Sequence, residues 1–476
     1  MRRGSSAKAG WLGACAAALA GCALLACGGA ETEAFAAPRR VFLVTIDTLR
    51  ADHLSFYGYP RETAPFLAGL AAHSAVFERA FAACSATSPA HASLLTGLYP
   101  PHHKVQRNLH ARLPASVRTL AEVFREHGYA TAAFVSVRWL DSLSRGFDVF
   151  EIPSRERVPG WRFAYAPAER TAGAALAWLE ERGADERFLL WLHLFDPHQP
   201  YLPPAAFAKR MEPQPRERAV LLRHWLEVQA KDPGADPAGG DLEAFVRWQN
   251  QYDAEIAYAD SQIARLYATS RAKDLLADSL WVITADHGEG LGGHSEGGHA
   301  AQVYQEQLHI PLLVHRPDGG LAAGRFPDLV RQVDVFPTLV EAIGAPLPAG
   351  ASEIRGASLL PLLRGEAERP EARTAFSVNE RKPEHAVLYA LQDGRHKFVL
   401  EVDGKDRLYA LTEDPREGVN LAGGGSALED AWRERTRALV RSLDEEALEI
   451  PEPDVSERDL EQLRALGYLD GSAPGP

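Results

Sequence analysis

A hydroxyl in the stretch 83–97 stands where it could be activated as a nucleophile. Pro89 lies near the start of an apolar run, and Gly97 follows its end. Proline in the first turn and glycine just after the last turn are typical of a short helix. We expect a helix over Ser88–Thr96, with Thr87 at or just before its N-cap. The free N–H groups and the dipole of that helix end favour a developing anion. The alternative is that Thr87 serves only as a helix cap.

Three apolar runs each end in an aspartate, which predicts a shared polar site. The runs cover 41–47, 188–196 and 281–286, and they end in Asp47, Asp196 and Asp286. Continuous apolar runs of this length are typical of strands that are buried on both faces of a parallel sheet. Because ligands of open α/β sheets bind outside the carboxyl edge, we expect these aspartates to face one site.

The third run continues into a glycine-rich loop that carries metal-ligand side chains. Asp286 is followed by His287 and, after a glycine, by Glu289, and His294 and His299 come shortly afterwards. A carboxylate beside an imidazole at a strand end is a common metal-binding pair. This mixture of nitrogen and oxygen ligands suits Zn²⁺ or Mn²⁺ better than Ca²⁺, which prefers oxygen ligands throughout.

The composition is that of a globular protein without a nucleic-acid partner. The chain has 476 residues, 46% of them hydrophobic, which fits one large domain with an appendage or two domains. Its formal net charge of −13 disfavours binding to a phosphate backbone. Of the four cysteines only Cys84 lies in the globular part, so a disulfide framework is excluded there.

The first residues have the layout of an export signal. Basic residues precede an uncharged run over 9–30 that is rich in alanine and leucine. An uncleaved membrane helix is the alternative, because the run is long enough to span a bilayer.

Within that run, the sequence Leu-Ala-Gly-Cys at 19–22 resembles the cleavage box of bacterial lipoproteins. We therefore expect a signal peptide over 1–21, a lipidated Cys22 and a tether over 22–39. Cys27 ends a second, poorer match. The protein would then be exported and held by its lipid anchor on the periplasmic face of the cell envelope.

Helical segments alternate with the apolar runs. Apolar residues recur at helical spacing over 116–127 and again over 252–266. Alternating strands and helices indicate an α/β fold with a mostly parallel sheet flanked by helices. We assign it to a catalytic domain over 40–345, and we interpret its polar, irregular stretch 205–250 as a helical insertion over the active edge.

After about residue 345 the pattern changes to a smaller α+β subdomain over 346–476. A strand over 397–405 enters an Asp-Gly turn, and 407–411 reads as its partner strand. A helix is expected near 427–446, and a capped amphipathic helix over 456–468.

The motifs of this chain resemble those of the sulfatase family, within the alkaline phosphatase superfamily, from about Val41 to Pro415. They are Ile46–His53, Ser88–Pro100, Asp196–Tyr201, Asp286–Glu289, Leu408-Tyr409 and Asp414-Pro415. The resemblance implies an alkaline-phosphatase-like sheet and a metal-dependent hydrolase of sulfate or phosphate esters. Its substrate would be a small-molecule, glycan or lipid ester.

The resemblance also implies roles for residues at matching positions. Asp47, Asp286 and His287 would bind a divalent metal, together with Thr87 at the nucleophile position. In superfamily members that handle phosphate esters, a metal activates such a hydroxyl.

Further residues fall at positions around the transferred group. His198 and His299 match the histidines that hold the oxyanion or protonate the leaving group. Asp196 fits a ligand of a second metal, and His91 and His294 are the remaining candidates for a second metal or for the substrate.

The departures from the sulfatase pattern change the expected mechanism. Sulfatases convert a cysteine or serine into formylglycine, whereas Thr87 stands at that position here. His91 replaces an arginine, Thr48 replaces an aspartate, and Cys84 lies too early to be converted. Threonine lacks the second hydroxyl with which formylglycine hydrate expels sulfate, so water or an acceptor alcohol must break its adduct. We therefore expect no formylglycine and a preference for phosphate monoesters and diesters.

Two other functions fit parts of the sequence. A phosphoethanolamine- or phosphoglycerol-type transferase also uses threonine at such a metal, but it normally has several membrane spans. A non-catalytic binding protein on the same fold is disfavoured by the intact set of Asp47, Thr87, Asp286 and His287.

Overall fold

The apolar runs that end in aspartate form neighbouring parallel strands. β1 (Arg40–Ile46) pairs over its whole length with β7 (Phe188–Leu194) on one side and with β8 (Ser279–Ala285) on the other. Every residue of these strands is buried, as expected of strands covered on both faces. Because they run in one direction, the residues that follow them leave the sheet at the same edge.

The computed structural model of the protein describes residues 35–108, 113–157, 164–231, 240–294, 298–348, 355–366, 373–380, 387–402 and 404–445. The expected signal peptide, Cys22, Cys27 and the expected helix over 456–468 lie outside the described residues. None of the helices in the described part of the chain is long and apolar enough to cross a membrane.

The central sheet has eight strands in the order β10-β2-β9-β8-β1-β7-β3-β4. Its other strands are β2 (Ala75–Phe81), β3 (Ala130–Val135), β4 (Val149–Glu151), β9 (His309–His315) and β10 (Gly324–Arg331). β9 runs antiparallel to both of its neighbours, β2 and β8, whereas the remaining pairs are parallel. The prediction of a mostly parallel α/β sheet is therefore confirmed. A separate pair is formed by β5 (Glu156–Arg157) and β6 (Ala164–Tyr165).

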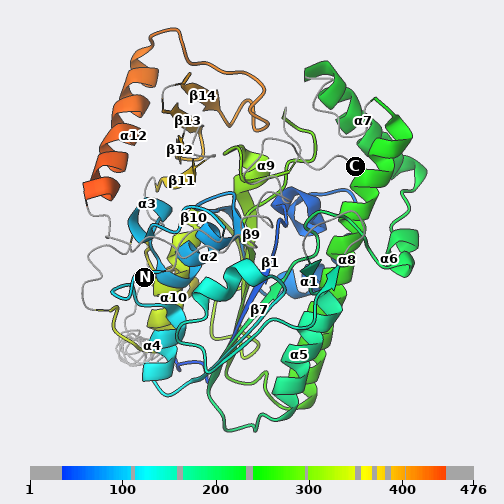
Figure 1. Ribbon diagram of the computed structural model, residues 1–476, viewed down its shortest axis with the longest axis vertical. Coiled ribbons are helices and arrows are strands. Elements are labelled where there is room, and N and C mark those ends of the chain that lie inside the picture. The colour runs from blue at the N-terminus through cyan, green and yellow to red at the C-terminus, as the bar shows by residue number, and fades with distance from the viewer. Residues whose placement is uncertain are drawn as a thin grey trace, which may run out of the picture. The chain divides into compact units, whose positions relative to one another are not determined.

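Helices cover both faces of this sheet (Figure 1). α1 (Pro65–Ala71), α5 (Ala168–Glu180) and α8 (Leu242–Ala272) lie on one face, and α2 (Thr87–Thr96), α4 (Leu120–Glu126) and α10 (Val335–Ala342) lie on the other. The remaining helices are α3 (Pro100–His103), α6 (Ala205–Arg210), α7 (Pro215–Lys231), α9 (Gln305–Leu308), α11 (Leu360–Leu363) and α12 (Ala427–Glu445). The 3₁₀ helices are η1 (Ala51–His53), η2 (Ser55–Tyr57), η3 (Arg138–Leu143) and η5 (Gln332–Asp334).

Aromatic side chains fix β1 between its neighbours. Phe42 stacks on Trp281 of β8 with ring centroids 3.9 Å apart, and it meets Phe188 of β7 edge-on at 5.4 Å. All three side chains are fully buried, and burial of one such side chain stabilises a fold by about 1.5–3 kcal/mol. The strand ends that carry the site are thus held on a rigid core.

The helical insertion predicted over 205–250 is confirmed in the part that the structure describes, where short connections join its helices. It forms α6, α7 and the first turns of α8. Nε2 of His224 on α7 lies 3.2 Å from the carbonyl oxygen of Leu291, to which Gln249 on α8 also donates at 3.1 Å. The insertion therefore contacts the loop after Asp286, at the carboxyl edge of the sheet.

A second, antiparallel sheet follows in the order β11-β12-β13-β14. Its strands are β11 (Ala375–Glu380), β12 (Val387–Gln392), β13 (His396–Glu401) and β14 (Arg407–Ala410), and α12 packs against β12 and β13. The predicted hairpin and the helix near 427–446 are confirmed. The boundary near residue 345 stays a prediction, and the residues described from Ala37 onward belong to one compact unit.

Candidate active site

Thr87 occupies the first position of α2 rather than its N-cap. The cap is Ala86, which makes no side-chain capping bond, and Gly97 ends the helix with a φ of 73°. Thr87 is fully buried, and its Oγ1 lies 3.5 Å from Nε2 of His287. The helix thus begins one residue earlier than expected, and the threonine hydroxyl faces the metal-type side chains instead of capping.

Asp47, Asp286 and His287 converge on one point at the carboxyl edge. Their ligand atoms lie within 4.8 Å of one another, and all three side chains are buried. Nε2 of His287 is 3.4 Å from Oδ2 of Asp286 and 3.9 Å from Oδ1 of Asp47. The Nδ1–H of His287 donates to the carbonyl oxygen of Gly288 at 2.9 Å, which leaves Nε2 as the electron-pair donor.

Unpaired buried oxygens show that this group fits a divalent cation. Both carboxylate oxygens of Asp47 and Oδ2 of Asp286 are buried without a hydrogen-bond partner. Oδ1 of Asp286 accepts from the backbone N–H groups of Thr48 and His287, at 3.1 and 2.7 Å. Burial, and then the neighbouring Asp286 and Glu289, raise the pKa of Asp47 well above its ordinary value. A bound cation would compensate these two adjacent carboxylates.

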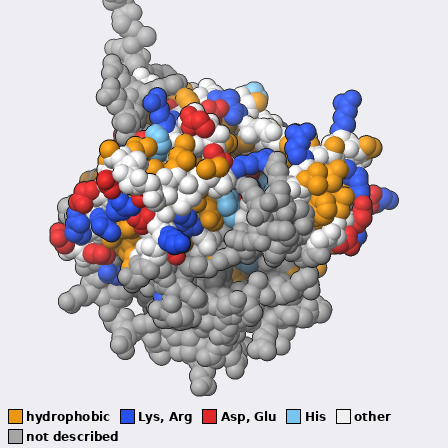
Figure 2. Space-filling model, turned by 90° about the horizontal axis from the view of Figure 1, so that it is seen from above, with side chains coloured by type: hydrophobic (Ala, Val, Ile, Leu, Met, Phe, Trp, Pro, Cys, Tyr) orange, Lys and Arg blue, Asp and Glu red, His pale blue; other side chains and the backbone are white. Residues whose placement is uncertain are grey.

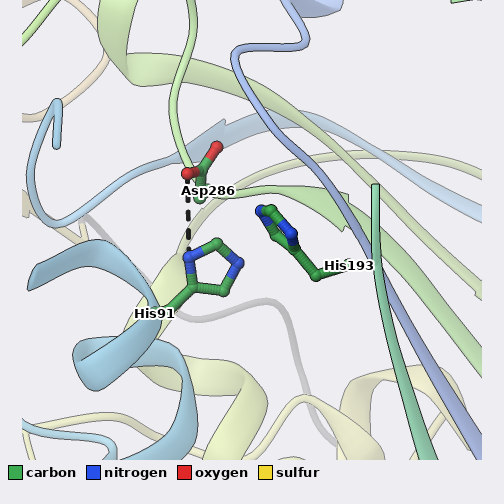
Figure 3. A group of neighbouring side chains, drawn as sticks. All are labelled: His91, His193 and Asp286. Atoms are coloured by element: carbon green, nitrogen blue, oxygen red, sulfur yellow. Dashed lines mark ion pairs between the residues drawn. The ribbon is translucent and has the colours of Figure 1, made fainter. Parts of the chain in front are cut away.

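Figure 3 shows His91 of α2, His193 of β7 and Asp286 pointing toward one another. Nδ1 of His91 is 3.7 Å from Oδ2 of Asp286. Both ring nitrogens of His91 are already used, because Nδ1–H donates to the Thr87 carbonyl at 2.8 Å and Nε2 accepts from the Thr45 hydroxyl at 3.0 Å. His91 therefore anchors the first turn of α2 and has no lone pair left for a metal.

His198 and His299 lie beside the metal-type cluster. The ring of His299 is 4.6 Å from that of His287 and 4.7 Å from that of His198. Nδ1 of His299 lies 3.1 Å from Oε1 of Glu289. Burial lowers the pKa of His198 to about 3 and the pKa of His299 well below its ordinary value, while burial raises the pKa of Glu289 to about 7. The ring of His299 therefore lies between those of His198 and His287.

Asp196 and His294 are not brought into this cluster. Oδ2 of Asp196 accepts from the backbone N–H of Ala168 at 2.8 Å, at the start of α5, and burial raises its pKa to about 6. His294 stacks on Tyr304 at 3.7 Å, with Nδ1 3.1 Å from Oε1 of Glu306. Neither residue belongs to a potential ligand group of the described chain.

Sequence reasoning missed the residues that hold the loop after Asp286. Nη1 of Arg50 donates to the Glu289 carbonyl at 3.0 Å and lies 3.5 Å from the carboxylate of Glu306. A Cβ added to Gly288 would come within 2.1 Å of the Glu306 carbonyl oxygen, so only glycine fits there. Gly288 in the motif is the feature of the sequence that could have predicted this close approach to Glu306.

From above, Figure 2 looks down on the carboxyl edge of the sheet. Charged side chains of both signs lie on the two flanks of this face, and hydrophobic, histidine and further charged side chains lie between them. The flanks correspond to the C-terminal part on one side and to the helical insertion on the other.

Comparison with known protein families shows the family of this chain. A family profile described as Sulfatase matches residues 39–345. The chain belongs to the sulfatase family. A second profile, described as N-sulphoglucosamine sulphohydrolase, C-terminal, matches residues 300–441. This sulfatase-family protein is therefore an ester hydrolase by family, on an alkaline-phosphatase-like fold.

Relatives of this sulfatase-family protein are similar over most of their length. N-acetylglucosamine-6-O-sulfatase of Bacteroides thetaiotaomicron is 24% identical, over 93% of this chain and 92% of that protein. Choline-sulfatase of Rhizobium meliloti is 26% identical, over 75% of this chain and 77% of that protein. The crystal structure of phosphonate monoester hydrolase of Agrobacterium radiobacter has a TM-score of 0.71 and 23% identity, over 85% of this chain and 96% of that one.

The departures of this sulfatase-family protein from the expected motif have local explanations in the fold. The Thr48 hydroxyl donates to the Asp47 carbonyl at 2.8 Å and is therefore turned to the backbone. Cys84 is buried, with Sγ 3.8 Å from Oδ1 of Asn379. Thr87 is thus the nucleophile-type side chain that reaches the Asp47–Asp286–His287 group.

Proposed function

We propose that this protein hydrolyses phosphate monoesters or diesters with Thr87 as its nucleophile, in preference to sulfate esters. The observation that carries the proposal is the position of Thr87, whose buried Oγ1 lies 3.5 Å from Nε2 of His287 at the N-terminus of α2. The proposed ligands Asp47, Asp286 and His287 surround the same point. A phosphonate monoester hydrolase with the same fold supports phosphorus chemistry on this scaffold.

A divalent cation bound by these residues would supply positive charge that lowers the pKa of the Thr87 hydroxyl and offsets charge on the transferred group. Imidazole and carboxylate ligands favour Zn²⁺ or Mn²⁺ over Ca²⁺. The α2 N-terminus adds backbone dipoles that favour the same anion.

The residues of the chain then perform a displacement in two stages. Thr87 Oγ1 loses its proton to a water molecule and attacks phosphorus, and the bond from phosphorus to the leaving oxygen breaks. That oxygen takes up a proton and departs as the alcohol. Water next attacks the phosphothreonine, which regenerates the Thr87 hydroxyl and releases phosphate or its monoester. We propose that His198 and His299 contact the oxygens of the transferred group and of the leaving alcohol.

We expect the protein to contain no formylglycine. Thr87 is not a substrate for that conversion, and Cys84 is buried against Asn379 rather than aimed at the ligand group. Threonine has no second hydroxyl, so hydrolysis of its adduct requires water. A phosphate adduct is open to such in-line attack.

The decisive experiment compares matched 4-nitrophenyl phosphate, bis(4-nitrophenyl) phosphate and 4-nitrophenyl sulfate, after reconstitution with Zn²⁺ or Mn²⁺. We expect faster turnover of a phosphate ester and partial activity of Thr87→Ser. Mass spectrometry of the peptide containing Thr87 establishes whether the side chain is unmodified. Faster turnover of the sulfate ester by a protein with unmodified Thr87 would overturn the proposal.

We also propose that the protein is exported and anchored through a lipidated Cys22, because residues 19–22 form a lipoprotein-type box. Mass spectrometry of the mature N-terminus is the test. An intact Met1, or a first residue at Cys27, would contradict it.

A further inference from the structure

The segment from Gly298 to Gln305, which carries His299, is tied to the nucleophile helix on one side. The backbone N–H of Ala300 donates to the Ser85 carbonyl at 2.8 Å. The Ser85 hydroxyl donates back to the carbonyl of Gln302, also at 2.8 Å. Ser85 lies two residues before Thr87, so the backbone that places the nucleophile also places His299.

The C-terminal sheet holds the other side of this segment with a buried ion pair. Nζ of Lys397 on β13 donates to the Val303 carbonyl and lies 2.7 Å from Oε1 of Glu417. Both charged side chains are 0% exposed. Oε2 of Glu417 accepts from the backbone N–H of Gln305 at 2.6 Å. One lysine and one glutamate thus fix two backbone groups of the segment.

Two further contacts join the same parts. Arg407 on β14 donates to Oε1 of Gln302 at 3.2 Å and to the hydroxyl of Tyr304 at 3.0 Å. The Gln305 side chain donates to Gln392 on β12 at 2.6 Å. Figure 1 accordingly shows the C-terminal sheet near α9, which begins at Gln305.

The geometry of Glu417 indicates that it is held in one place. Its φ is 54°, a left-handed conformation that is unfavourable for a residue with a side chain. Its carboxylate is buried between Lys397 and the segment, and its carbonyl oxygen lies 3.4 Å from Nε2 of His294. A buried ion pair adds little net stability compared with apolar side chains, but it fixes the groups that it joins.

We propose that Lys397 and Glu417 are positioning residues for the reaction, and that they act by holding His299 beside His287. This inference depends on the proposed function in one respect, which is that His299 contacts the reacting ester. Neither residue touches substrate. The C-terminal sheet is therefore a working part of the active site, because its ion pair fixes two backbone groups of the segment that carries His299.

A double-mutant cycle tests whether Lys397 acts through His299. We expect Lys397→Met to lower kcat by about 10-fold or more in the wild-type background and to add less than about 2-fold in a His299→Ala background. The assay uses 4-nitrophenyl phosphate, or 4-nitrophenyl sulfate if the wild-type protein turns over only that ester. Equal losses in both backgrounds would mean that the lysine is merely structural and would overturn the proposal.

The matched control is Arg433→Met in the same C-terminal part. It removes ion pairs to Asp406, Glu429 and Asp430, none of which belongs to the segment. We expect it to leave kcat within about 2-fold of the wild type. If Lys397→Met fails to fold, Glu417→Gln replaces it, because it keeps the shape of the side chain and an acceptor for the Gln305 N–H.

Hydrogen exchange gives a readout that needs no turnover. We expect Lys397→Met or Glu417→Gln to speed exchange of the peptide over 298–308 about 10-fold, while Arg433→Met leaves it unchanged. Unchanged exchange in both ion-pair variants would overturn the proposal whatever the substrate is. Failure of the phosphate preference alone would overturn the proposed function and leave this inference standing.

Discussion

Nε2 of His193 lies 3.4 Å from Oδ2 of Asp47, with both side chains fully buried at the carboxyl edge of the sheet. Nδ1 of His193 faces the backbone N–H of Ser136 at 3.4 Å, so a neutral ring carries its proton on Nε2. Burial lowers the pKa of His193 well below its ordinary value, which keeps the ring neutral. His193 therefore turns its Nε2–H toward the Asp47 carboxylate, at a distance and angle that do not make a hydrogen bond.

The first prediction concerns this contact. His193→Phe keeps a ring of similar size and removes the N–H that faces Asp47. We expect affinity for Zn²⁺ or Mn²⁺ to fall by about 10- to 100-fold, with turnover recovered at high metal concentration. Titration of activity against free metal measures the shift. An unchanged metal affinity would show that His193 only fills space in the core.

The second prediction separates metal binding from turnover. Asp286→Ala should lose bound metal and activity together, because it removes a carboxylate that lies 3.4 Å from His287. Thr87→Ala should keep most of the metal and lose turnover by roughly 10³-fold, because the attacking hydroxyl is gone. Elemental analysis of both purified variants, beside their kcat values, gives the comparison. Full metal content in Asp286→Ala would contradict the assigned ligand set.

The third prediction concerns Gly288, whose backbone N–H donates to the Gln307 carbonyl at 2.8 Å. Gly288→Ala places a Cβ 2.1 Å from the Glu306 carbonyl oxygen, so the loop must shift. We expect a loss of stability of about 1–3 kcal/mol and weaker metal binding. The matched control is Gly69→Ala in α1, where an added Cβ meets nothing within 4 Å. That change should be neutral or stabilising by up to about 1 kcal/mol. Thermal unfolding of the two variants decides between these outcomes.

The fourth prediction is an acid sensitivity that originates at His103. This buried side chain accepts from the Val105 N–H at 3.1 Å and lies 3.0 Å from the Ser93 hydroxyl. Burial, and then His102, lower the pKa of His103 from 6.5 to about 3. The folded state thus binds fewer protons than the unfolded state between these values, so stability is full above pH 6.5 and falls as the pH drops.

At pH 5 the neutral His103 should lower the stability of the folded state by about 2 kcal/mol relative to neutral pH. We expect the free energy of unfolding of His103→Gln, measured with urea, to fall by about 2 kcal/mol less between pH 7.5 and pH 5 than that of the wild type. His73→Gln, at an exposed histidine, should follow the wild type. Parallel losses in the wild type and His103→Gln would refute a neutral His103 in the fold.

The chain order of apolar and polar residues determined the scaffold. Runs such as 41–47 and 281–286 are short and apolar throughout, which is typical of strands buried inside a layered sheet. Parallel strands bring their carboxyl ends to one edge, which predicted that Asp47 and Asp286 lie close together. Proline and glycine likewise bounded the helix of Thr87 to within one residue.

Only the tertiary structure decided which polar side chains share that edge. Asp196 follows its strand as Asp47 does, yet its carboxylate accepts from Ala168 at the start of α5. His193 stands inside an apolar run, and nothing in its neighbours along the chain indicates that its ring meets Asp47. Such contacts join residues far apart in the sequence, because they depend on how whole elements pack. Local propensity and periodicity carry no information about that packing, which is why the ring partners of the site and the Lys397–Glu417 pair emerged only from the fold.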